Sequence, residues 1–260
     1  MGILGIDYGN TKMPITFLYN NLIDQATSIK ESTVISQYGT SYVHDGDLNS
    51  AYRGTSGNGT STLLFDFGSA VYMDSICCIS NLTTTGTLVL RAGATSSVGD
   101  QVFSIPIDGL GTSHKFFGNF AYQYWRVDLF GQTGILKHQI NELFLGKRLS
   151  IVEMPSYPLE NSIEENTTEL TSERGQKWVY SNYERENWIL NFEGVNRTTE
   201  NNLYNMYRFV RKNTQPFFMA LDSDNNPNEI KYVRFKDNAF MSDEITKNVF
   251  DISLEIEKEV

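Results

Sequence analysis

Hydrophobic and polar residues alternate along short segments of the first 150 residues, and Gly, Ser, Thr and Asn separate these segments. A period of two places every second side chain on the same face of a β-strand. Two such series are Leu88, Leu90 and Ala92, and Trp125, Val127 and Leu129. The pattern predicts short strands joined by turns, which is typical of a β-sandwich.

A different pattern begins after about residue 175. Trp188, Leu190 and Phe192 alternate in an expected strand, and a segment with helical spacing follows Thr199. Its apolar stripe consists of Leu203, Met206, Tyr207 and Val210. Further strands are expected over 217–221, 230–235 and 249–257. The C-terminal unit is therefore predicted to be α+β, a sheet packed against one helix, which leaves the whole chain mainly β.

Composition divides the chain into four expected parts. Residues 1–12 carry three glycines and are expected to form an N-terminal arm, and residues 13–149 to form the sandwich. The segment 150–175 holds two prolines among many Glu, Asn, Ser and Thr residues, which indicates a linker or an extended arm. Residues 176–260 are expected to form the α+β domain.

The charge balance narrows the range of partners. The chain has 21 Lys and Arg residues against 31 Asp and Glu residues, a formal net charge of −10. Nucleic-acid affinity comes largely from cations that neutralise phosphates, so we expect no sequence-specific nucleic-acid partner. No segment approaches the roughly 20 apolar residues that cross a bilayer, and the start lacks the basic and apolar parts of a secretion signal. We expect neither membrane insertion nor export by such a signal.

The sequence contains no recognisable catalytic motif. It lacks the nucleophile elbow, the phosphate-binding loop and the zinc-binding motifs, and its three histidines are scattered. Cys77 and Cys78 are adjacent in an apolar segment, where a disulfide between them would be strained and would close no useful loop. We predict that both are reduced thiols, that the protein is not an enzyme and that it needs no cofactor other than a structural Ca²⁺ considered below.

A series of landmarks in residues 41–147 resembles the discoidin, or coagulation-factor C-type, family of galactose-binding-like β-sandwiches. In order, the landmarks are residues 45–49, 62–68, 87–92, 124–129 and 140–146. The resemblance implies a jelly-roll sandwich that presents a surface and binds a partner, and is seldom catalytic.

The turn Asp45-Gly46-Asp47-Leu48-Asn49 suggests a metal site. Side-chain oxygens at alternate positions around a glycine can converge on a hard cation such as Ca²⁺. In many discoidin-like sandwiches this turn and a Glu near the last strand share a structural Ca²⁺, which by resemblance assigns Asp45, Asp47, Asn49 and Glu142. The Thr-x-Trp that usually follows is replaced by residues 50–53. The alternative is an Asx-type turn that bonds nearby backbone amides without a metal.

Sugar-binding members of that fold present exposed aromatic side chains and an arginine from their loops. The resemblance gives six candidate glycan-binding residues here: Tyr52, Arg53, Phe116, Phe117, Tyr122 and Tyr124. The alternative is that these aromatic residues belong to the core or to an interface.

The C-terminal unit resembles tail and baseplate proteins of bacteriophages. The resemblance rests on a Trp-x-Leu-x-Phe strand at 188–192, a short helix, the Pro216-Phe217 strand and an acidic alternating strand at 250–255. It implies a structural virion protein of the distal-tail, hub or baseplate-adaptor kind, made in the host cytoplasm. Such a protein would form a homo-oligomeric ring with other tail or baseplate proteins and present the sandwich. The alternative is a carbohydrate-binding or adhesion module that recognises host-surface glycans.

Overall fold

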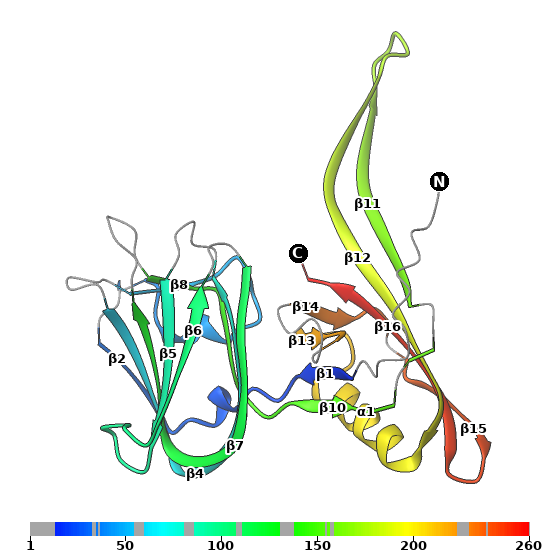
Figure 1. Cartoon of the computed structure of the whole chain (residues 1–260). Coiled ribbons are helices and arrows are strands. Elements are labelled where there is room, and N and C mark those ends of the chain that lie inside the picture. The colour runs from blue at the N-terminus through cyan, green and yellow to red at the C-terminus, as the bar shows by residue number, and fades with distance from the viewer. Residues whose placement is uncertain are drawn as a thin grey trace.

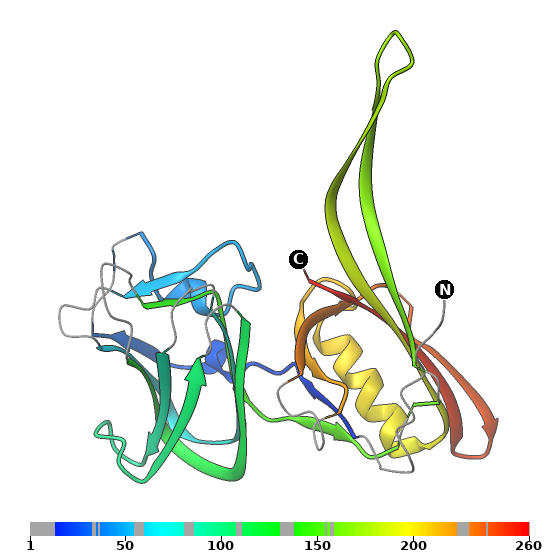
Figure 2. The same ribbon diagram turned by 45° about the horizontal axis from the view of Figure 1, so that its top comes forward.

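The structure is a computed structural model, and it describes residues 14–259 except for 33–34, 36, 55–59, 81–85, 108–110, 131–137, 154, 157–158, 223–228 and 238. The expected N-terminal arm lies outside the described residues. The described part is mainly β, as predicted, and forms two units that lie side by side (Figures 1 and 2). Two short 3-10 helices, η1 (Leu22–Gln25) and η2 (Thr40–Val43), belong to the first unit.

The first unit is built around two long, bent strands. Its main sheet has the order β2-β4-β7-β5-β6, β9 pairs with the second half of β4, and β3 pairs with β8 in a separate ladder. The strands are β2 (Ser28–Glu31), β3 (Tyr52–Gly54), β4 (Thr60–Ser80), β5 (Gly86–Gly93), β6 (Gln101–Ile107), β7 (Gly111–Phe130), β8 (His138–Ile140) and β9 (Glu142–Gly146).

The bend of β4 folds this sheet over one core. Leu63 and Phe65 from its first half pack in the same cluster as Ile76 and Cys78 from its second half (Figure 1). The pairing of β4 with β7 shifts register near Gly68, whose φ of +71° is one that glycine adopts without strain. The prediction of short strands was therefore wrong here, because a bulge and a glycine bend these strands without ending them.

The second unit is a sheet that packs against one helix. Its order is β10-β1-β13-β14-β16-β12-β11, and β15 pairs with β16. Its elements are β1 (Ile15–Leu18), β10 (Leu149–Ile151), β11 (Glu160–Thr171), β12 (Lys177–Asn196), α1 (Arg197–Phe209), β13 (Phe217–Ala220), β14 (Ile230–Phe235), β15 (Met241–Thr246) and β16 (Val249–Lys258). The predicted apolar stripe of the helix is buried in the same cluster as Trp188, Leu190 and Phe192.

The two ends of the sandwich segment belong to the second unit. In β1, Phe17 pairs with Leu149 of β10 on one side and with Met219 of β13 on the other. The expected boundaries at 13 and 149 therefore do not separate the sheets, and the sandwich is inserted between β1 and β10. All four residues of β1 are buried, and so short a run carries no periodicity that assigns it to either sheet.

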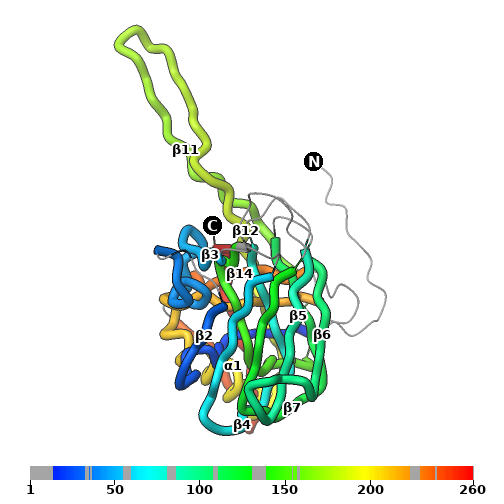
Figure 3. The backbone as a smooth tube through the Cα atoms, turned by 90° about the vertical axis from the view of Figure 1, so that its left-hand side faces the viewer, coloured from blue at the N-terminus to red at the C-terminus, as the bar shows by residue number. Residues whose placement is uncertain are grey.

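Residues 160–171, inside the segment expected to be a linker or an extended arm, form strand β11. With β12 it makes a long two-stranded ribbon that projects far beyond the sheet (Figures 1 and 3). Every residue of β11 is exposed, so neither face needs the apolar alternation that marks a half-buried strand. For that reason its polar composition resembled that of a linker.

A third apolar cluster joins the two units. It contains Cys77 and Phe144 from the sandwich and Phe218 and Tyr232 from the large sheet. Cys77 and Cys78 are both free and buried.

Candidate functional site

The turn at Asp45 uses its carboxylates to bond its own backbone. Asp45 Oδ1 accepts from the Asp47 amide at 3.0 Å, and Asp47 Oδ1 accepts from the Asn49 amide at 2.9 Å. The Asn49 side-chain amide nitrogen donates to the same Asp47 Oδ1 at 3.2 Å. Among the described residues, no group of three or more His, Cys, Asp or Glu side chains is arranged to hold a metal ion. These hydrogen bonds are those expected of the Asx-turn alternative.

Glu142 reaches the turn from β9. Its Oε2 accepts from the Gly46 amide at 3.1 Å, and the Tyr232 hydroxyl of β14 donates to the same carboxyl group. The pKa of Glu142 is raised to about 8, mainly by burial and to a smaller extent by the nearby Asp45, against the lowering effect of these two hydrogen bonds. The neutral acid is therefore favoured at neutral pH, as expected of a buried carboxyl group that forms no ion pair within the described part of the chain.

A small polar cavity of about 170 Å³ adjoins Glu142 between the two units. Asp24, His44 and Arg234 line it as well, and His44 Nδ1 lies 2.7 Å from Asp24 Oδ1. Ligand pockets usually have about 300 Å³ or more. The cavity contains acids and a histidine but no serine or cysteine nucleophile among its lining residues. We interpret this cavity as part of the polar contact between the two units.

The candidate glycan residues do not form one exposed platform. Tyr52 is fully buried in the sandwich core, so the expectation that it faces a ligand is wrong. A shift of one residue in the pairing of a strand moves every side chain to the opposite face of the sheet. In the observed pairing of β3 with β8, the Tyr52 side chain faces the core.

The other candidates pack against the protein itself. The guanidinium of Arg53 lies 4.3 Å from the Tyr38 ring centre, and that of Arg148 lies 5.2 Å from the ring centre of Phe116. Tyr122 is half-buried and packs edge-on against Trp125. Phe117 is buried in the core and Tyr124 is half-buried. Core or interface packing therefore accounts for most of this set.

A groove on the sandwich surface escaped the sequence analysis. Tyr72 is 54% exposed, and Lys147 Nζ lies 5.0 Å from its ring centre. The groove measures about 310 Å³, and Asn20 and Gln25 supply amide groups to its wall. An exposed ring beside amide and ammonium groups is suited to a small polar ligand. Tyr72 lies at the bend of β4, where regular alternation is interrupted, and that interruption was the only sequence signal.

The largest group of exposed apolar side chains lies on the ribbon. Trp178 is 44% exposed and pairs with Leu170, while Tyr180 is 54% exposed and pairs with Thr168. Residues 178 and 180 share one face because side chains alternate along a strand. Ile163, Val179 and Tyr183 are also exposed. An isolated two-stranded ribbon is marginally stable in water, and an exposed apolar patch commonly marks an interaction site.

Comparisons with known proteins give structural similarity only. No protein-family model matches the sequence, and no curated protein matches it. The structural neighbours include carbohydrate-binding modules with galactose-binding-like β-sandwiches. No helix in the described part of the chain has the length and apolar character needed to cross a membrane.

Three of these structures illustrate the similarity. Chitosan-binding module 1 of a chitosanase/glucanase from Paenibacillus sp. IK-5 has a TM-score of 0.41 and 14% identity, over 48% of this chain and 98% of that module. The structure of the CBM32-1 and CBM32-2 domains of Clostridium perfringens ZmpB has a TM-score of 0.40 and 17% identity, and the match covers 50% of this chain and 35% of that one. The CBM32 of AlyQ, in complex with 4,5-unsaturated mannuronic acid, has a TM-score of 0.37 and 17% identity, and the match covers 46% of this chain and 94% of that module.

Proposed function

We propose that this protein is a structural assembly subunit that binds copies of itself through the β11–β12 ribbon and presents the inserted sandwich. The observation that carries the proposal is the exposed apolar face of the ribbon around Trp178 and Tyr180. Burying such side chains against a partner is the main favourable term in protein association. The ribbon and the sandwich extend from different sides of the large sheet, so both can be engaged at once (Figure 1).

The surface that would receive the ribbon is strand β15 of the next copy. In β15, Met241 and Ile245 are exposed, and the strand pairs only with β16 among the described strands. An unpaired strand edge is a ready template for another strand. Contact between two different surfaces of one chain is head-to-tail, and it closes into a ring when the rotation between copies permits.

The sequence resemblance to phage tail and baseplate proteins supports placing such a ring in a virion tail. Within this proposal the protein is a distal-tail, hub or baseplate-adaptor component that contacts other tail or baseplate proteins. The large sheet and α1 would serve as the tail-type α+β domain, since the resemblance covers about residues 176–260.

The proposal is tested by the masses of assemblies formed by two surface variants. The ribbon variant carries Trp178→Ser and Tyr180→Ser, and the edge variant carries Met241→Ser and Ile245→Ser. We expect wild type to form rings by light scattering and electron microscopy, and each variant alone to be monomeric. An equimolar mixture should form heterodimers, because one intact ribbon can still meet one intact edge. Tyr72→Ser, a substitution on the sandwich, serves as the control and should leave rings intact. Wild type that stays monomeric at every concentration, alone and with tail partners, would refute the proposal.

A second candidate function is glycan binding by the sandwich at the groove beside Tyr72. The exposed ring, Lys147 and the amides of Asn20 and Gln25 favour it. A glycan array probed with wild type and Tyr72→Ala tests this candidate, with Tyr42→Ala as the control, since Tyr42 is exposed and is not among the residues lining the groove. Loss of a defined glycan signal in Tyr72→Ala alone supports binding at the groove, and a signal that survives in that variant contradicts it.

A further inference from the structure

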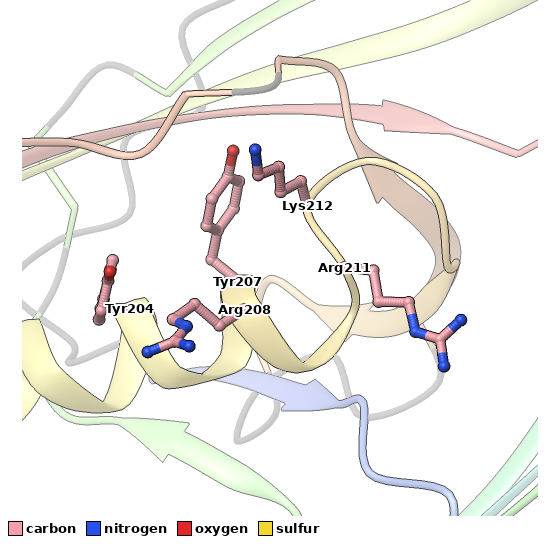
Figure 4. A pocket seen from close by; sticks show the side chains of 5 residues that line it. All are labelled: Tyr204, Tyr207, Arg208, Arg211 and Lys212. Carbon is pink, nitrogen blue, oxygen red and sulfur yellow. The ribbon is translucent and has the colours of Figure 1, made fainter.

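A second pocket of about 310 Å³ lies at the C-terminal end of α1, far along the chain from the sandwich. It is lined by Tyr204, Tyr207, Arg208, Arg211 and Lys212, and we call it the basic pocket (Figure 4). A volume of this order is at the lower end of the range for small-molecule sites, so it suits a ligand the size of a monosaccharide.

The cations of the basic pocket are not neutralised by the protein. Among the ion pairs in the described part of the chain, none involves Arg208, Arg211 or Lys212. Basic side chains at a helix C-terminus offset the partial negative charge there, which is equivalent to about half an elementary charge. The charge of three cations is larger than is needed to offset this partial charge. They are also clustered in a chain whose net charge is −10.

Tyr207 supplies an unpartnered polar group to the same pocket. The residue is 5% exposed, and its hydroxyl is buried without a hydrogen-bond partner. Its ring is held between Phe235 and Phe240, with ring centres 5.3 Å and 5.7 Å away. Native structures satisfy the great majority of buried polar side chains, so this hydroxyl is a fixed donor that a molecule bound in the pocket can satisfy.

Acidic Asp237 is the charged group whose influence reaches Tyr207, and it does not line the pocket. Burial and then Asp237 raise the pKa of Tyr207, so its hydroxyl remains a hydrogen-bond donor at neutral pH. Because Asp237 is not a lining residue, the charged side chains that line the pocket are all cationic.

The backbone turn after α1 positions the lysine. Arg211 and Lys212 have φ angles of +51° and +67°, values that residues other than glycine seldom adopt. The Lys212 amide bonds to the Tyr207 carbonyl at 2.9 Å and fixes this turn. In Figure 4 the polar ends of Lys212 and Tyr207 lie near each other, and the Arg208 side chain lies toward Tyr204. Arg211 extends away from both tyrosines. Strained backbone of this kind is concentrated at functional sites.

We propose that the basic pocket binds a small sugar that carries one carboxylate or phosphate group. Arg208 and Lys212 bind the anionic group, and the Tyr207 hydroxyl donates a hydrogen bond to one of its oxygens. The ring of Tyr204, 40% exposed, packs against the apolar face of the sugar. The half-charge of the helix end opposes an anion, but the two cations that face the pocket outweigh it.

The test is a calorimetric titration of the full chain with four probes: glucuronate, glucose 6-phosphate, neutral glucose and inorganic phosphate. We expect at least one anionic sugar to bind about tenfold or more tightly than glucose and than phosphate alone, because only it uses both the cations and the ring. Comparing glucuronate with glucose 6-phosphate identifies the anionic group. Arg208→Gln and Lys212→Gln should each weaken binding about tenfold, as the loss of a charged hydrogen bond does.

Two further variants separate a site from general charge attraction. Lys247→Gln removes the same charge from an exposed side chain that is not among the residues lining the basic pocket, so it should change the affinity less than about twofold. Tyr207→Phe should weaken binding about two- to tenfold while leaving the melting temperature equal or higher, because it removes an unsatisfied buried hydroxyl. Equal binding of glucose and the anionic sugars, or equal losses in Arg208→Gln, Lys212→Gln and Lys247→Gln, would overturn the proposal.

Discussion

The Tyr232 hydroxyl of β14 donates a hydrogen bond to the carboxyl group of Glu142 in β9, and this bond joins the large sheet to the last strand of the sandwich. Both residues are largely buried, and Tyr232 belongs to the apolar cluster between the units. The two hydrogen bonds donated to this carboxyl group favour its ionised form, but burial favours the neutral form more strongly and raises the pKa.

The first prediction concerns pH. Since burial raises the pKa of Glu142 to about 8, the unfolded chain releases this proton at a lower pH than the folded chain does. Stability should therefore fall as pH rises from the ordinary glutamate pKa of 4.5 in the unfolded chain to the raised pKa in the folded chain, by up to about 1.4 kcal/mol per pH unit. Glu142→Gln should lose less stability than wild type between pH 5 and pH 8 in urea unfolding. Equal losses in the two proteins would mean that Glu142 does not titrate in this way.

The second prediction concerns calcium. Because the carboxylates of the Asp45 turn already accept backbone amides, we expect a chelator and added Ca²⁺ to leave the melting temperature unchanged. An ion that binds only the folded state would raise it. A melting temperature that falls with chelator, recovers with Ca²⁺ and becomes insensitive in Asp45→Ala would establish the metal site implied by the family resemblance.

The third prediction compares two tryptophans of β12. Trp188 is buried in the core of the second unit, so Trp188→Ala should lower the free energy of unfolding by about 3–5 kcal/mol. Trp178 is exposed on the ribbon, and Trp178→Ala should cost the monomer less than about 1 kcal/mol while weakening self-association. Chemical unfolding together with light scattering measures both effects. A reversed order of the two stability losses would contradict the packing described for β12.

The fourth prediction concerns the thiols. Burial raises the pKa of Cys78 to about 12 and that of Cys77 well above its ordinary value, so neither is a reactive thiolate at neutral pH. A thiol reagent should label neither cysteine in the native protein at pH 8 and both after unfolding. Fast labelling of the native protein would show that the interface around Cys77 opens.

Local periodicity predicted the parts of the fold that depend on neighbours in sequence. Leu203 and Met206 are buried where the helical spacing placed them, and Trp188 lies in the same core. The partners of β1 lie more than a hundred residues away, and no local pattern encodes such pairing. Tyr52 was misplaced because the direction of a side chain on a short strand depends on register. The basic pocket escaped detection because the orientation of Lys212 depends on the turn after α1.

The pairing of Phe17 with Leu149 has an evolutionary consequence. The chain leaves the large sheet after β1 and returns in β10, its immediate neighbour, so the two junctions lie side by side. A tight turn could close that gap, and so could an unrelated domain with adjacent termini. The sandwich is thus an insertion whose two ends are adjacent, so another domain with adjacent termini could occupy the same place while the large sheet keeps its hydrogen bonds.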